Sequence, residues 1–140
     1  MDVTFDPCAG VSVAVDGEDP ARLSAVDTAV TLWNAQGPLK LTRNDDAGLP
    51  RLPVTFERAA AAFRGVYDDE RGIVIVNSVL SNDHMRAIIV AHELGHAFGL
   101  WHSSPSEDPS VMKADNVDIA PTAGDVARLR TLWDSCNTTE

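Results

Sequence analysis

The feature that most constrains this chain is a segment with histidines at positions 92, 96 and 102, which reads His-Glu-Leu-Gly-His-Ala-Phe-Gly-Leu-Trp-His. His92 and His96 are four residues apart, so an α-helix would project both imidazoles from one face onto a single metal ion. Glu93 lies about 100° around the same helix, where its carboxylate can reach a water on the metal without displacing it as a ligand. The segment therefore predicts a zinc-binding helix, with Glu93 as general base.

A third ligand requires the chain to turn after this helix. A helix continuing past His96 would point His102 elsewhere, but Gly99 can take the left-handed conformation that ends a helix and turns the chain back. Three protein ligands leave a fourth position open, which is typical of catalytic rather than structural zinc. A His-x-x-x-His pair alone also occurs by coincidence, whereas the longer motif arises by chance less than about once per million starting points. We therefore expect one catalytic zinc ion, held by His92, His96 and His102.

The spacing of apolar residues predicts alternating strands and helices. Strands are expected at residues 11–15, 39–43, 54–56, 63–67 and 73–76, the last of them central in a sheet because it is apolar on both faces. Helices are expected from Pro20 to the Gly37-Pro38 stop, from Asn82 or Asp83 to Gly99, and from Thr122 with Val126, Leu129, Leu132 and Trp133 facing inward. The segments 44–50 and 103–120 are predicted loops. This order predicts an α/β sandwich of one sheet against two helices, with a short C-terminal part.

Size and charge narrow the class of protein. The 140 residues fit a single domain of ordinary composition, 44% hydrophobic and 23% charged. A formal net charge of -10 would repel phosphate backbones and anionic lipids, so we expect neither nucleic acid nor a membrane as partner. We also expect a monomer. No apolar stretch approaches the ~20 residues of a membrane span. The first residues also lack the basic start and apolar core of a secretory signal, so an exported protein would have lost that segment.

Two cysteines, Cys8 and Cys136, lie near opposite ends of the chain. Because domain termini often lie close together in space, a disulfide between them is plausible. Such a bond would imply an oxidising compartment and a secreted, extracellular protein. Two separate buried thiols are the alternative, since two cysteines alone do not prove pairing.

The motif His-Glu-x-x-His-x-x-Gly-x-x-His, followed by Met112, resembles the zinc signature and Met-turn of the metzincin metallopeptidases. Similarity to the matrixin branch in particular rests on Ser103, Ser110-Val111-Met112, Thr122 and Asp125. The resemblance extends from about residue 73 to residue 133 and is weaker before it. It implies a twisted, mostly parallel five-stranded sheet with an antiparallel edge strand, two long helices, and a short C-terminal subdomain with the Met-turn and a C-terminal helix. The boundary would lie near residue 99, dividing residues 1–99 from 100–140.

The resemblance also implies how the site works. Met112 would form a hydrophobic base beneath the three histidines, and a peptide would lie extended along the edge strand at 63–67. Zinc would activate a water, from which Glu93 takes a proton and delivers it to the leaving amine, so internal peptide bonds would be cleaved. The pocket beside the cleaved bond would be set by the loop after Met112 and would favour a hydrophobic side chain. The candidates in this loop are Lys113, Asp115, Asn116, Val117 and Ile119.

The chain also departs from the family pattern. Ala114 stands where other branches carry a fifth, tyrosine ligand, and His84 is the only histidine outside the motif, so a second zinc is not expected. The acidic run 68–70 reads more simply as a solvated hairpin turn than as a calcium site, and calcium is left open. No latency peptide is recognisable, although Cys8 could in principle block the zinc as a thiolate.

Two other functions use the same motif. The first is a non-catalytic zinc or peptide-binding module on the same fold, which the presence of Glu93 disfavours. The second is a metal-dependent hydrolase of a non-peptide amide. The sequence favours a zinc endopeptidase acting on proteins or peptides over both.

Overall fold

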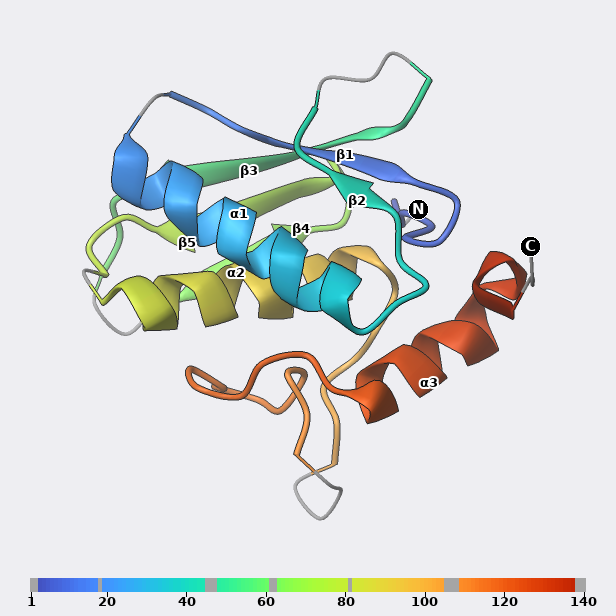
Figure 1. Cartoon of the computed structure of the whole chain (residues 1–140). Coiled ribbons are helices and arrows are strands. Elements are labelled where there is room, and N and C mark those ends of the chain that lie inside the picture. Colours follow the sequence, from blue (N-terminus) through green and yellow to red (C-terminus); the bar gives the residue numbers. More distant parts are fainter. Residues whose placement is uncertain are drawn as a thin grey trace.

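The computed structural model describes residues 3–17, 19–44, 48–60, 63–80, 82–104 and 109–137. Its elements are β1 (Val11–Val15), α1 (Pro20–Ala35), β2 (Leu41–Thr42), β3 (Arg51–Glu57), β4 (Gly65–Asp68), β5 (Ile73–Asn77), α2 (Asp83–Ala97), α3 (Ala123–Leu132) and a 3-10 helix, η1 (Asp134–Asn137) (Figure 1). Every predicted strand and helix is present, with β2 shorter and β3 longer than predicted. Parts of both predicted loops, residues 45–47 and 105–108, lie outside the described residues.

The five strands form one sheet in the order β2-β1-β3-β5-β4. Neighbouring strands are parallel except β4, which pairs antiparallel with β5 and occupies the edge. In this pair Gly65 lies opposite Val76 and Asp68 opposite Ile73. β5 takes an inner position, as its apolar faces predict. The predicted α/β fold, with a mostly parallel five-stranded sheet and an antiparallel edge strand, is confirmed.

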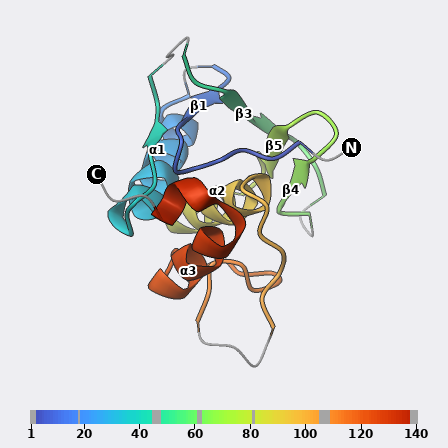
Figure 2. The ribbon, with the colours of Figure 1, turned by 90° about the vertical axis from the view of Figure 1, so that its right-hand side faces the viewer.

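Both long helices cover the same face of the sheet, and they pack against each other (Figures 1 and 2). Trp33 on α1 is fully buried between the two, where its indole N–H donates to the carbonyl of Ala91 at 2.9 Å. Its ring meets that of Phe98 edge-on, with centroids 5.6 Å apart. Because α2 is buried along most of its length, the helix that carries the motif is held on several sides. No described helix is both long and apolar enough to cross a membrane.

The ends of α2 match the sequence signals that predict them. The Asn82 side chain accepts a hydrogen bond from the amide of Met85 at 2.9 Å, which caps the first turn. At the other end Gly99 has a φ of 100°, the left-handed conformation expected from the sequence. The amide of Leu100 then donates to the carbonyl of Gly95 at 3.0 Å, and the chain turns back towards the face of α2 that carries His92 and His96.

The C-terminal helix differs from prediction in one side chain. Val126 and Leu129 are buried as expected, but Leu132 is 52% exposed, so its predicted inward orientation is wrong. The prediction extended helical spacing through Trp133, whereas α3 ends at Leu132 and Trp133 has an extended backbone. The Trp133 indole instead donates to the carbonyl of Phe98 at 2.8 Å, which leaves Leu132 at the surface.

A disulfide joins Cys8, just before β1, to Cys136 in η1, with an S–S distance of 2.04 Å. The prediction of a bond between the two ends of the chain is confirmed, and the alternative of two separate thiols is wrong. Cys8 therefore offers no thiolate, and the alternative in which it blocks the zinc is wrong as well. Beside the bond, the Ser135 hydroxyl donates to the Asp6 carboxylate at 2.7 Å, a second link between the two ends.

Candidate active site

The fold brings the three motif histidines together at the C-terminal half of α2 and the turn that follows it. Each of His92, His96 and His102 offers a ring nitrogen, and these nitrogens all lie within 4.8 Å of one another. The ring centroids are 4.9 to 5.3 Å apart. His92 and His96 come from adjacent turns of one helix face, while His102 reaches the cluster because the chain reverses at Gly99.

Backbone carbonyls hold two of the imidazoles in place. The Nδ1 atom of His92 lies 2.7 Å from the carbonyl oxygen of Val111, and that of His96 lies 2.8 Å from the carbonyl oxygen of Leu100. A carbonyl only accepts hydrogen bonds, so each Nδ1 carries the proton and each Nε2 keeps its lone pair. Metal-binding histidines are commonly oriented in this way, and the donor set therefore fits a zinc ion.

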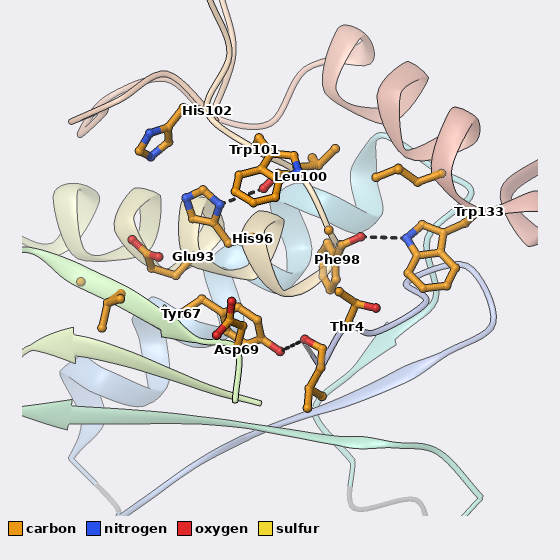
Figure 3. A pocket seen from close by; sticks show the side chains of 15 residues that line it. Thr4, Tyr67, Asp69, Glu93, His96, Phe98, Leu100, Trp101, His102 and Trp133 are labelled. Atoms are coloured by element: carbon orange, nitrogen blue, oxygen red, sulfur yellow. Dashed lines mark hydrogen bonds between the residues drawn. The ribbon is translucent and has the colours of Figure 1, made fainter. Parts of the chain in front are cut away.

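Burial sets the ionisation of the site. It lowers the pKa of His92 and brings that of His96 to about 4, so both rings are neutral, as metal ligands must be, near neutral pH. Burial also raises the pKa of Glu93 to about 7, against a hydrogen bond from the Tyr67 backbone that lowers it. Glu93 is 6% exposed and borders the cavity beside His96 and His102 (Figure 3).

Met112 lies directly beneath α2. It is fully buried, and a Cβ built at Gly95 would come within 2.3 Å of the Met112 sulfur. The close approach of the two segments thus depends on glycine in the middle of the motif. The amide of Ser103 also donates to the carbonyl of Met112 at 3.0 Å, which ties the chain after the third histidine to the same turn.

The buried carboxylate of Asp125 holds the backbone segment that contacts His92. Asp125, at the start of α3, is fully buried and accepts hydrogen bonds from the Ser110 hydroxyl, the Val111 amide, the Thr122 amide and hydroxyl and the Arg128 guanidinium. Burial by itself raises the pKa of Asp125, but the hydrogen bonds outweigh it and the pKa lies below its usual value. Asp125 therefore fixes Val111, whose carbonyl orients His92.

We expect Asp125→Asn to lower the free energy of unfolding by roughly 2–4 kcal/mol near neutral pH. The asparagine NH₂ group would face the buried N–H and O–H groups that donate to the Asp125 carboxylate, and donors cannot pair with donors. The folded-state pKa of Asp125 is depressed, so its contribution is present above the unfolded pKa of ~3.9 and is lost as pH falls through the folded pKa. Urea unfolding of both proteins with chelator present should show the difference shrinking below about pH 4.

Asp118→Asn, at an exposed aspartate of the preceding loop, is the matched control and should change stability little at any pH. A difference between Asp125→Asn and wild type that stays constant down to strongly acidic pH would contradict the assigned role of the Asp125 charge.

Two cavities flank the cluster on the side where β4 forms the edge of the sheet. The larger cavity, about 760 Å³, extends from Glu93 and His102 towards Tyr67, Trp101 and Trp133 (Figure 3). The smaller cavity, about 360 Å³, lies on the other side of Glu93 and His102, which line both cavities. Its lining includes Arg64, Asp115 and Asn116, two of them in the loop that the resemblance assigns to the pocket beside the cleaved bond. An extended chain along β4 would thus meet a cavity on each side of Glu93.

Two acidic residues outside the motif that are potential metal ligands, Asp68 and Asp6, have partners within the fold. Asp68 accepts hydrogen bonds from the amides of Glu70 and Arg71 and from the Arg71 side chain, which matches a hairpin turn. Among the described residues, the other cluster with potential metal ligands is Asp6 with the two disulfide-bonded cysteines, whose sulfurs are already consumed.

Trp101 and Asp125 have no separate role that the sequence alone predicts. Trp101 stands inside the motif but at one of its variable positions, and Asp125 contributed only to the resemblance. For Trp101, the signal that could have indicated a role is its position directly before a predicted metal ligand. For Asp125, the signal was a capping residue at Thr122 followed three positions later by a carboxylate.

No family model matches the chain, and no curated protein matches its sequence. Solved structures do share its fold. Myroilysin aligns with a TM-score of 0.51 and 15% identity over 99% of this chain and 66% of that one, so the chain spans just under two thirds of the length of myroilysin. The hatching enzyme zinc-protease high choriolytic enzyme 1 of the medaka fish Oryzias latipes aligns with a TM-score of 0.56 and 11% identity over 89% of each chain. A zinc-dependent peptidase of Methanocorpusculum labreanum aligns with a TM-score of 0.50 and 15% identity over 85% of this chain and 93% of that one.

The fold of this chain is therefore metzincin-like, an α/β domain shared with structures of zinc proteases. At these identities the likeness concerns the fold, and the chemistry must be argued from the site itself.

Proposed function

We propose that this protein is a zinc-dependent endopeptidase that hydrolyses internal peptide bonds of proteins or peptides. The observation that carries the proposal is the convergence of ring nitrogens from His92, His96 and His102 within 4.8 Å, with Glu93 bordering the same cavity. The two similar structures named as a zinc-protease and a zinc-dependent peptidase support it, since this chain shares their fold.

Each residue has a distinct role in the proposed reaction. His92, His96 and His102 would hold one zinc ion, which supplies Lewis acidity to polarise the scissile carbonyl and to make water a stronger acid. Glu93 would accept the proton of the attacking water on its carboxylate and return it to the leaving nitrogen. Gly99 would let His102 reach the metal, and Met112 would support the histidines from below.

Cleavage inside a chain is supported by the position of the site. β4 is an edge strand, and extended peptides can pair with the backbone of such strands. Cavities on both sides of Glu93 offer room for side chains before and after the cleaved bond.

The finer assignment is a matrixin-like minimal catalytic domain, with residues 1–99 as N-terminal and 100–140 as C-terminal subdomain. Ser110 and Asp125, which contribute to that resemblance, are hydrogen-bonded to each other beneath the site. A secreted, extracellular location is supported by the disulfide, because such bonds persist in oxidising compartments. The protein would act as a monomer.

The test is cleavage of a mixed peptide library, with the zinc content of the protein measured in parallel. We expect about one zinc per chain, cleavage at internal bonds, loss of cleavage with a chelator and recovery when zinc is returned. Cleavage that persists after the metal is removed would refute zinc catalysis. Zinc binding without cleavage would favour the binding module, and cleavage only of non-peptide amides would favour the other hydrolase.

A further inference from the structure

Exposed large hydrophobic side chains are concentrated at one place on this protein. The described residues include five such side chains, and four of them line the larger cavity: Val3, Val66, Trp101 and Leu132. Trp101 is 80% exposed and Leu132 is 52% exposed, which leaves much of their apolar surface in water. Apolar surface gathered in one hollow, rather than scattered, is typical of a binding site.

The larger cavity is continuous with the catalytic cluster. Glu93, His96 and His102 line its inner end, and Trp101 is the residue directly before His102 (Figure 3). A Cβ built at Gly99 would lie 3.5 Å from a methyl group of Leu132, so Leu132 stands over the turn that leads to Trp101. A ligand seated on these side chains would therefore lie next to the bond being cleaved.

The direction of β4 determines which part of a peptide substrate would occupy the larger cavity. The smaller cavity is lined by Arg64 and Gly65 at the start of β4, whereas the larger one reaches Tyr67 and Asp69 at its end. A peptide that pairs antiparallel with β4, the more stable arrangement, runs from the end of β4 towards its start. Its residues before the cleaved bond thus meet the larger cavity, and those after the bond meet the smaller one.

The charges of the lining further restrict the ligand. Two carboxylates, Asp69 and Glu93, line the larger cavity, and neither lysine nor arginine is among its lining residues. An acidic side chain would find no lysine or arginine partner there, whereas a large apolar side chain would bury the surface of Trp101 and Leu132.

We propose that Trp101, with Leu132 and Val66, forms a recognition site for bulky apolar side chains on the N-terminal side of the cleaved bond. This inference rests on the proposed peptidase function. It makes Trp101 a specificity-determining residue on the N-terminal side of the cleaved bond.

The first experiment compares peptides with leucine, alanine or aspartate at each of three positions before and three positions after the cleaved bond. The wild type should prefer leucine over alanine, and alanine over aspartate, before the bond. Trp101→Ala should lower kcat/KM for the leucine peptides by about tenfold more than for the alanine peptides, as expected for a hydrophobic contact. Val79→Ala removes the remaining exposed large hydrophobic side chain, outside the cavity, and should behave like the wild type.

The second experiment measures binding without turnover, in zinc-loaded Glu93→Gln protein. Trp101 is the tryptophan most exposed to water, because Trp33 is fully buried and Trp133 is only partly exposed. Its fluorescence emission should shift to the blue with peptides carrying leucine before the bond, and less with alanine.

The outcomes separate the two proposals. Equal binding and cleavage of leucine and alanine peptides, or a Trp101→Ala variant with wild-type selectivity, would overturn the recognition site while leaving the peptidase function intact. Selective binding through Trp101 in a protein that hydrolyses nothing would support the recognition site and refute the peptidase function.

Discussion

The Glu93→Gln variant is expected to bind zinc as the wild type does and to lose kcat by about 10²–10⁴-fold, the range that a positioned general base supplies. Glutamine keeps the shape of the side chain but has no carboxylate to accept a proton. The three histidines remain, and Nδ1 of His92 and of His96 keeps its carbonyl partner, so the metal site should persist. Steady-state kinetics on one peptide, with zinc measured by mass spectrometry, would test both parts.

The matched control is Glu57→Gln, the same change at an exposed glutamate that ends β3, away from both cavities. It should leave kcat and zinc content unchanged. A Glu93→Gln protein that keeps its zinc and more than about half of wild-type kcat would show that another group moves the proton. A protein that loses its zinc would instead show that Glu93 helps to hold the metal.

The centre of the site could be predicted because its geometry is local. His92, Glu93 and His96 are placed by the pitch of one helix, and Gly99 turns the chain within the next few residues. The sheet was predictable for a similar reason, since alternation and turn signals mark each strand, and a strand apolar on both faces belongs inside.

The remaining features depend on contacts between distant segments. Asp125 reaches Val111 only because α3 packs beneath the site, and nothing in the spacing of α3 predicts which backbone amide will donate to its carboxylate. Leu132 was assigned to the core by helical spacing, but the helix ends there and the side chain lines a cavity instead. The segment before β1 lines the same cavity, since the amide of Val3 donates to the carbonyl of Asp69 at 2.7 Å. Such pairings arise from the folded chain as a whole.

Removing the disulfide, by Cys8→Ser with Cys136→Ser, should lower the free energy of unfolding by roughly 5 kcal/mol, because the bond closes almost the whole chain in the unfolded state. The two cysteines are separated by 128 residues in sequence. Loss of the disulfide should also disturb the larger cavity, because its walls include Val3 from one end of the chain and Leu132 from the other. Urea unfolding of the oxidised wild type and the variant measures the first effect, and kcat/KM for leucine peptides measures the second.

Ser135→Ala is the control for this region, because it removes the hydroxyl that donates to Asp6 and leaves the covalent link in place. It should cost only about 1 kcal/mol, the usual net contribution of one hydrogen bond. If the double cysteine variant were as stable as Ser135→Ala, hydrogen bonds and packing rather than the covalent link would hold the two ends together. If both stability and kcat/KM for leucine peptides fall while zinc content stays at one per chain, the disulfide fixes the walls of the larger cavity, and α2 with its turn forms the metal site independently.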